Sequence, residues 1–230
     1  ETSFLRERQF TSDVSHELRT PVAVILSHCE DLLEHGNLAS EERRELEIIQ
    51  ARAKGMAQMN AQLLLLSRAD QNRQPLHLET VNLTELLEII LEEQEELALE
   101  KKIELRSELA PDVSITADET MMIRLFENLL TNAIRYGREN GWVMVAMAAA
   151  EDHVTISVRD NGIGISEEHL PHIWERFYQA DSSRTASRQG AGLGLPMVQW
   201  IVKAHHGTIQ VRSLEGIGTE FTLQLPLCQP

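Results

Sequence analysis

The stretch Gln71-Asn72-Arg73-Gln74-Pro75 divides the sequence into two parts with different apolar periodicity. Its polar residues and its proline are typical of a linker, because proline cannot continue a helix. Before this stretch, apolar residues recur every three or four positions, as they do in amphipathic helices. After it, short alternating runs typical of strands are mixed with helical runs. We therefore expect two domains, residues 1–75 and residues 76–230.

The first domain is expected to be a hairpin of two long helices. One helix is predicted from Phe4 to about Leu33, and a polar break at residues 35–40 leads to Ser40, the predicted N-cap of the second. The apolar seam residues are Phe10, Val14, Leu18, Val22, Ile25 and Leu32 in the first helix and Leu46, Ile49, Ala53, Met56, Leu63 and Leu66 in the second. Such seams are typical of coiled coils, and two helices alone form a thin core. We therefore expect a dimeric four-helix bundle; packing of both helices on the second domain is the alternative.

The second domain is expected to be an α+β sandwich. Alternating residues predict strands at 103–109, 113–117, 142–149, 153–160, 208–214 and 219–225. Helical runs are predicted at 82–101, 119–136 and about 195–205, with Asn82 as the N-cap of the first. Strands mixed with helices, and a strand pair at the C-terminus, favour this layered architecture.

The composition excludes several classes of protein. A hydrophobic share of 42% with 12 glycines is ordinary for a globular chain and unlike a disordered or collagen-like one. The net charge of −15 disfavours nucleic-acid binding through a basic face. Cys29 and Cys228 show no pairing pattern, which fits a reducing compartment. The longest apolar run, 142–150, is far shorter than the ~20 residues that span a bilayer. The chain begins at Glu1 and carries no secretory signal, so we expect a fragment of a longer protein.

The first of four segments that carry candidate chemistry runs from Phe10 to Pro21 and contains His16 and Glu17. At about 100° per residue, His16 falls about 160° from Leu18, and is expected to face solvent. An exposed, neutral imidazole can act as a nucleophile, and Glu17 could accept the proton of its other ring nitrogen. A structural histidine is the usual alternative, but it would be expected on the seam.

The second segment is Glu127-Asn128-Leu129-Leu130-Thr131-Asn132-Ala133-Ile134-Arg135-Tyr136. Asn128, Asn132 and Tyr136 follow one another at intervals of four along the margin of a buried helix stripe. Asparagine is a mediocre helix former, so two in one row suggest a ligand. Carboxamide oxygens suit Mg²⁺, which is often shared with nucleotide phosphates. Two solvated asparagines are the alternative.

The third segment, Asp160-Asn161-Gly162-Ile163-Gly164-Ile165, follows a predicted strand directly. A simple hairpin turn is the common interpretation of such a sequence. Here Ser166-Glu167-Glu168 follows, a signal for the start of a helix, so we do not expect the chain to turn back into a strand. Its glycines would let a ligand approach the backbone, and Asp160 could accept a hydrogen bond from an exocyclic amine.

The fourth segment, Gly190-Ala191-Gly192-Leu193-Gly194-Leu195-Pro196, is expected to open a helix. Backbone N–H groups at such a helix start bind anions. The polar residues 181–189 before it, including Arg184, are typical of a mobile lid over phosphates. The segment is neither a Walker A loop nor a dinucleotide-fold loop; a flexible loop without function is the alternative.

In this order, the segments resemble the sequence boxes of bacterial-type sensor histidine kinases. The matching residues are Ser15–Pro21 (H-box), Asn128–Tyr136 (N-box), Asp160–Gly164 (G1 box), Trp174–Tyr178 (F-box) and Gly190–Gly194 (G2 box). The resemblance covers about Phe10 to Leu225, and five boxes in order are more specific than any one of them.

The resemblance implies a phosphotransfer hairpin followed by an ATP-binding domain of the gyrase, chaperone and histidine kinase superfamily. His16 would be the phosphoacceptor and Glu17 its acid–base partner. The phosphoryl group would pass to an aspartate on the receiver domain of a response regulator. Thr20 would act in dephosphorylating that regulator.

The resemblance also implies a site for ATP and Mg²⁺. Asn128 and Asn132 would hold the metal ion and the triphosphate. Family members usually carry lysine where Arg135 stands, so the geometry at the phosphate is expected to differ. The remaining residues expected at the nucleotide are Tyr136, Asp160, Gly162, Gly164, Phe177, Arg184, Gly190, Gly192 and Gly194.

As partners the resemblance implies a second copy of the chain and a response regulator, with no nucleic acid. Any membrane anchor would lie outside this chain, and the fragment is expected on the cytoplasmic side. Two other functions stay open. An ATPase of the same superfamily would not need the exposed His16-Glu17 pair. A silent scaffold would be expected to have lost asparagines or glycines of the boxes, and none is missing.

Overall fold

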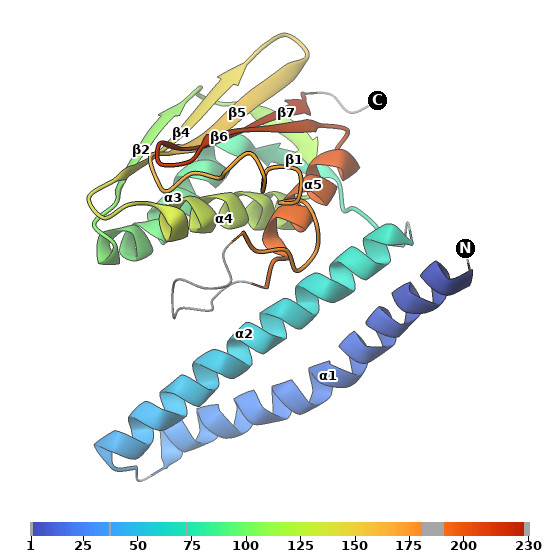
Figure 1. Ribbon diagram of the computed structural model, residues 1–230, viewed down its shortest axis with the longest axis vertical. Coiled ribbons are helices and arrows are strands. Elements are labelled where there is room, and N and C mark those ends of the chain that lie inside the picture. Colours follow the sequence, from blue (N-terminus) through green and yellow to red (C-terminus); the bar gives the residue numbers. More distant parts are fainter. Residues whose placement is uncertain (1, 37, 72, 181–190, 228–230) are drawn as a thin grey trace. The chain divides into compact units, whose positions relative to one another are not determined.

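The computed structural model describes residues 2–36, 38–71, 73–180 and 191–227, without the side chains of residues 2–17 and 19. The chain forms two compact units, Glu1–Pro75 and Leu76–Pro230. Figure 1 shows a helical hairpin in the first unit and a sheet covered by helices in the second. Among the described residues, no helix is long and apolar enough to cross a membrane.

The hairpin consists of α1 (Thr2–His35) and α2 (Ser40–Asp70) (Figure 1). The predicted break between them is confirmed, but the prediction of Ser40 as N-cap is wrong. Ala39 is the N-cap, and Ser40 is the first helical residue. The reason is that the Glu42 carboxylate reaches back and accepts the Ala39 N–H at 2.9 Å, which satisfies the helix start without a hydroxyl cap.

The predicted seam of α1 divides into two stripes. Val22 is buried in the hairpin together with Cys29, seven residues later. Leu18, Ile25 and Leu32, also seven residues apart, are 43–45% exposed. A period of seven keeps each stripe on one side of a helix. The seam was predicted for a dimeric bundle, so the exposure of Leu18 and Ile25 in a single chain does not contradict it.

The second unit contains a five-stranded sheet in the order β2-β4-β5-β7-β6. Its strands are β2 (Glu104–Leu109), β4 (Trp142–Ala149), β5 (His153–Asp160), β6 (Thr208–Leu214) and β7 (Gly218–Pro226). The β2–β4 pair is parallel and the other pairs are antiparallel. A separate antiparallel pair joins β1 (Glu79–Asn82) to β3 (Ser114–Ala117).

Three helices cover one face of the five-stranded sheet (Figure 1): α3 (Leu83–Glu100), α4 (Glu119–Tyr136) and α5 (Gly194–Ala204). On β4, Val143, Val145 and Met147 are buried and alternate with half-buried residues, as expected for a sheet with one covered face. On the helix side, α4 buries Leu125 and Leu129 completely or nearly so. The predicted sandwich is confirmed.

Most predicted element bounds are confirmed within two residues, and Asn82 caps α3 by accepting the N–H groups of Thr84 and Glu85. Two predictions failed. The short strand β1 was missed, because only Val81 of its four residues is buried and no alternation is visible. The helix signal at Ser166 gives a series of turns. Pro171 explains this, since it has no N–H with which to continue a helical ladder.

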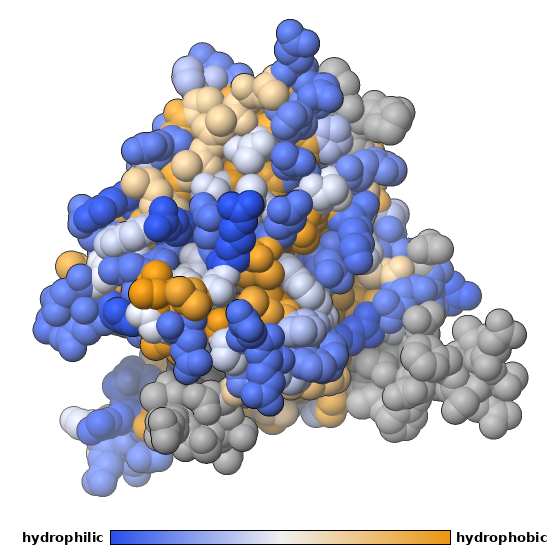
Figure 2. Space-filling view, turned by 45° about the horizontal axis from the view of Figure 1, so that its top comes forward, coloured by the Kyte–Doolittle hydropathy of each residue, from blue (hydrophilic) through white to orange (hydrophobic). Residues whose placement is uncertain are grey.

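Hydrophilic residues cover most of the face of the molecule shown in Figure 2, with small apolar areas between them. Exposed apolar side chains of the second unit include Ile163, Leu214 and Ile217, which come from the segment after β5 and the β6–β7 turn.

Candidate functional site

The asparagines of α4 lie at the margin of its buried stripe. Asn128 and Asn132 are half-buried and Tyr136 is half-exposed, whereas Leu129 and Ala133 are buried. The Asn128 amide nitrogen donates to the Arg124 carbonyl at 2.5 Å, which fixes the side chain. Its Oδ1 faces α5, because a Cβ added to Gly194 would lie 2.6 Å from that oxygen. Asn128 and the first residue of α5 are thus direct neighbours.

The donor set of α4 fits a hard cation shared with phosphates. Because the Asn128 amide nitrogen is bound to the backbone, Oδ1 is the atom presented towards α5. Neutral carboxamide oxygens are ligands that Mg²⁺ accepts alongside phosphate oxygens and water. Asn132 adds a second carboxamide one helical turn later on the same side. The residues present therefore suit Mg²⁺ bound together with a triphosphate.

Arg135 is half-buried near the C-terminus of α4. The Lys101 ammonium, from the end of α3, donates to the carbonyl groups of Ile134 and Arg135. Such contacts satisfy carbonyls that a helix end leaves without partners. Burial lowers the pKa of Lys101, and the positive charge of Arg135 lowers it further. A network from α3 thus holds the end of α4.

Asp160 ends β5 and is only 8% exposed. Its Oδ1 accepts the Gly162 N–H at 2.8 Å and the Thr219 N–H at 3.3 Å. Burial raises the pKa of the Asp160 carboxyl, and these two hydrogen bonds oppose the rise. Among the described residues no donor binds Oδ2, so this oxygen can accept a hydrogen bond from a ligand. The arrangement can recognise an exocyclic amine.

The glycines after Asp160 are required by close packing of protein backbone. A Cβ on Gly162 would lie 2.3 Å from the Tyr136 carbonyl oxygen, which also accepts the Ile163 N–H at 3.1 Å. Gly164 has φ +70°, and a Cβ there would lie 2.1 Å from the Leu214 carbonyl oxygen. The segment therefore packs between the end of α4 and the β6–β7 turn. This packing is a reason for the glycines that sequence reasoning, which considered only ligand approach, did not provide.

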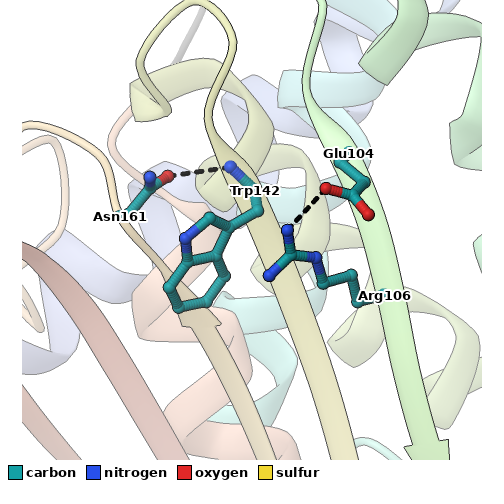
Figure 3. Close-up of polar contacts among 4 residues, drawn as sticks. All are labelled: Glu104, Arg106, Trp142 and Asn161. Atoms are coloured by element: carbon teal, nitrogen blue, oxygen red, sulfur yellow. Dashed lines mark hydrogen bonds and ion pairs between the residues drawn. The ribbon is translucent and has the colours of Figure 1, made fainter.

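Asn161 ties the same segment to β4, a role that sequence reasoning missed. Its Oδ1 accepts the Trp142 N–H at 2.8 Å (Figure 3), and a Cβ on Gly141 would lie 2.6 Å from that oxygen. The Trp142 ring in turn lies beside two guanidinium groups, 5.6 Å from that of Arg106 and 5.5 Å from that of Arg159. Glu104 pairs with Arg106 at 2.6 Å (Figure 3). No feature of the isolated sequence points to this long-range contact.

Thr219 and Ser213 were also missed. Thr219 is buried, donates its N–H to Asp160, and shares a hydroxyl–hydroxyl hydrogen bond of 2.8 Å with Ser213. The Ser213 hydroxyl oxygen accepts the Ile165 N–H at 2.8 Å. Both residues thus support the segment around Asp160 from β6 and β7. The glycine-rich stretch 216–219 was a signal that could have drawn attention to Thr219.

Phe177 and Gly192 lie on either side of the expected lid and contact each other. The Phe177 N–H donates to the Gly192 carbonyl at 2.8 Å. Both have positive φ, +64° and +66°, and a Cβ on Gly192 would lie 2.6 Å from the Phe177 carbonyl carbon. The Phe177 side chain is 58% exposed. Arg184 and Gly190 lie outside the described residues.

The candidate phosphoacceptor segment lies in α1. The backbone of His16 and Glu17 is helical, and their side chains lie outside the described residues. Thr20, one turn after His16, is exposed. Within the second unit, the contacts Asn128–Gly194, Tyr136–Ile163 and Phe177–Gly192 bring three of the predicted segments and the F-box-like segment into one region. This region combines three kinds of group. They are the carboxamide oxygens of α4, which can bind a metal ion, the buried Asp160 carboxylate, which can accept a hydrogen bond from an amine, and the N-terminus of α5.

Family comparisons divide the chain in the same order. The model of the His kinase A (phospho-acceptor) domain matches residues 6–72. The model of the histidine kinase-, DNA gyrase B- and HSP90-like ATPases matches residues 117–229. The two matches include all five sequence boxes.

Similar proteins include sensor histidine kinase RppB of Synechocystis, 35% identical over 98% of this chain and 50% of its own length. The phosphate regulon sensor protein PhoR of Pseudomonas aeruginosa is 33% identical over 94% of this chain and 49% of its own length. A solved structure of full-length ShkA in complex with AMPPNP superposes with a TM-score of 0.82 and 28% identity, covering 96% of this chain and 46% of that one. The chain spans about half the length of the curated relatives it matches.

Proposed function

Because the chain belongs to the sensor histidine kinases of bacterial two-component systems, we propose that it phosphorylates itself on His16 with ATP and passes the phosphoryl group to a response regulator. The observation that carries this proposal is the presence, in one chain and in order, of a phosphoacceptor domain and an ATPase-type domain. An ATPase without the first domain would have no acceptor of its own.

We assign adenine recognition to Asp160. Its Oδ2 would accept a hydrogen bond from the exocyclic amine of adenine, while Oδ1 keeps its two bonds to the backbone. Gly162 and Gly164 would shape the pocket by keeping the segment close to α4 and the β6–β7 turn. An acceptor at this place favours adenine over guanine, which presents a carbonyl oxygen there.

The triphosphate is assigned to α4 and the start of α5. Asn128, Asn132 and Arg135 would contact the phosphates from α4, with Tyr136 at the end of the helix. The backbone N–H groups at the start of α5, at Gly194, favour anions. Mg²⁺ held by the oxygens of Asn128 and Asn132 would neutralise phosphate charge. Arg184, Phe177, Gly190 and Gly192 are proposed to serve the lid.

The proposed transfer is an in-line displacement at the γ-phosphorus. A ring nitrogen of neutral His16 attacks, an N–P bond forms, the bond to the β-phosphate oxygen breaks and ADP leaves. Glu17 accepts the proton from the other ring nitrogen. Positioning and charge neutralisation contribute more to such a step than a strong base does. The phosphoryl group then moves to an aspartate oxygen of the regulator, and His16 is regenerated. Thr20 would orient the water that later hydrolyses the regulator's aspartyl phosphate.

A homodimer is proposed from the outer stripe of the hairpin. Leu18, Ile25 and Leu32 on α1, and Ile49 and Met56 on α2, are exposed and spaced by seven residues within each helix. A hollow of about 110 Å³ between α1 and α2, lined by Val22, Ala23, Leu26, Ala57, Asn60 and Ala61, lies within the same hairpin. A second hairpin would cover such stripes as a four-helix bundle does. The proposed location is the cytoplasmic side of a membrane.

The test is incubation with γ-labelled ATP and Mg²⁺, followed by treatment of the labelled protein with acid or alkali. The proposal predicts stoichiometric label that is lost in acid and survives alkali, as a phosphoramidate does. Release of phosphate without protein-bound label would favour a plain ATPase and contradict the proposal. Binding of ATP with neither product would favour a scaffold.

A further inference from the structure

His205 is fully buried at the C-terminus of α5. Its ring makes two hydrogen bonds to backbone groups. Nδ1 donates to the Ile201 carbonyl at 2.8 Å, and Nε2 accepts the Asp118 N–H at 3.0 Å. The carbonyl can only accept and the amide can only donate, so the ring is neutral and carries its proton on Nδ1. Burial lowers the pKa of His205 and favours this neutral form.

Asp118 joins three segments. It is the N-cap of α4, and its Oδ1 accepts the Met121 N–H at 3.1 Å. Its Oδ2 accepts the His77 N–H at 2.9 Å, from the segment that precedes β1. Its own N–H goes to His205. Asp118 is only 4% exposed, so loss of any partner would leave a buried polar group without a hydrogen bond.

The pair lies at the start of α4 and at the end of α5, away from the contact between Asn128 and Gly194. Helix α4 packs against α5 (Figure 1). Asp118, the N-cap of α4, meets His205 at the C-terminus of α5, and Asn128, in the middle of α4, meets Gly194 at the start of α5. The two helices therefore run antiparallel, and each spans about 15 Å between its two contacts, at about 1.5 Å per residue. The spacing of α4 and α5 is fixed at these two places.

We propose that His205 and Asp118 are a positioning pair for the nucleotide pocket. They join the N-terminus of α4 to the C-terminus of α5. As a result, the Asn128 oxygen and the start of α5 keep the spacing that a triphosphate requires. Neither side chain touches the nucleotide. The requirement is for a hydrogen-bond acceptor on residue 205 that reaches the Asp118 N–H. The inference rests on the proposed ATP site and adds residues to it that no sequence box contains.

Three variants of the whole chain test the pair. His205→Phe keeps a ring of similar size without an acceptor. His205→Gln can present Oε1 close to the place of Nε2. His206→Asn is the matched control, since the neighbouring His206 is exposed and asparagine tolerates its φ of +56°. The measurements are the ATP dissociation constant by calorimetry with Mg²⁺ and the melting temperature of each variant.

We expect His205→Phe to raise the dissociation constant about tenfold or more, in keeping with the sensitivity of sites to displacements below ~1 Å. His205→Gln should recover most of the affinity, and His206→Asn should bind as the wild type does. A folded His205→Phe with wild-type affinity would overturn the pair, as would a His205→Gln with no recovery. If His205→Phe does not fold, it is replaced by His205→Asn, whose side chain is too short to reach the Asp118 N–H. If neither variant folds, the pair serves only the stability of the domain, and the proposal is overturned as well. Absence of ATP binding by the wild type would instead refute the proposed function.

Discussion

Replacing Asp160 by asparagine separates its two tasks. In the protein, Oδ1 accepts two backbone N–H groups, and Oδ2 is the oxygen that we assign to the adenine amine. The amide oxygen of Asp160→Asn can keep both backbone bonds, and its NH₂ group then takes the place of Oδ2. A donor would meet the amine of adenine, which is also a donor. The segment should stay in place while adenine recognition is lost.

The expected loss of ATP affinity follows from the hydrogen bond that the substitution removes, the one between the adenine amine and Oδ2. A hydrogen bond to a charged group contributes about 1.5–3 kcal/mol. Its loss should raise the ATP dissociation constant about 10- to 150-fold. Because burial raises the pKa of Asp160 above its ordinary value of 3.8, the ionised carboxylate reduces stability at neutral pH. Asp160→Asn should therefore be more stable than the wild type at pH 7. The gain should shrink as the pH falls towards 3.8, where the carboxyl is protonated in the unfolded chain as well.

The assay is calorimetric titration of wild type and variant with ATP and with GTP, beside thermal unfolding at several pH values. Guanine presents an acceptor where adenine presents its amine, so the preference for ATP should fall or reverse. Asp160→Ala is the control: it leaves two buried N–H groups unpaired and should lose about 1–3 kcal/mol for each. Parallel loss of ATP and GTP affinity in Asp160→Asn, or unchanged ATP affinity, would refute the assignment.

Three further predictions concern other parts of the chain. Asn132→Ala should weaken Mg-ATP binding and autophosphorylation together without unfolding the domain, since it deletes no large apolar group; normal affinity in calorimetry would remove Asn132 from the site. Thr20→Ala should keep most autophosphorylation but lose most dephosphorylation of the regulator, and a proportional change in both rates would show that Thr20 only shapes the helix before Pro21. Ile25→Asp should shift the chain from dimer to monomer in sedimentation, because it places a charge in the outer stripe; an unchanged dimer would place the interface elsewhere.

Much of the fold could be predicted because it depends on patterns among residues that are neighbours in the sequence. Alternation over 153–160 and the asparagine cap at Asn82 each require only neighbouring residues, and both predictions are confirmed. The N-cap prediction at Ser40 failed because the Glu42 side chain accepts the N–H of Ala39, so the helix begins one residue earlier than predicted. For α1, a single sequence does not say which seam residues α2 covers and which a second hairpin would cover.

The sequence predicted the candidate site residues but not the contacts that hold them in place. The glycines around Asp160 stood out, yet their close contacts with Tyr136 and Leu214 join segments far apart in the chain. Asn161 and Thr219 act through equally distant partners, and nothing in the local pattern distinguishes them from surface polar residues. Pairings of this kind become visible only when the strands are assembled.

The most direct test of the account is the labelling of His16→Gln with γ-labelled ATP. His28→Gln is the matched control, because His28 lies exposed on the same helix. The ATP affinity of each protein is measured on the same preparation. The account predicts that His16→Gln takes up no acid-labile label while it binds ATP as the wild type does, and that His28→Gln is labelled normally. Labelling of His16→Gln at the wild-type rate would contradict it.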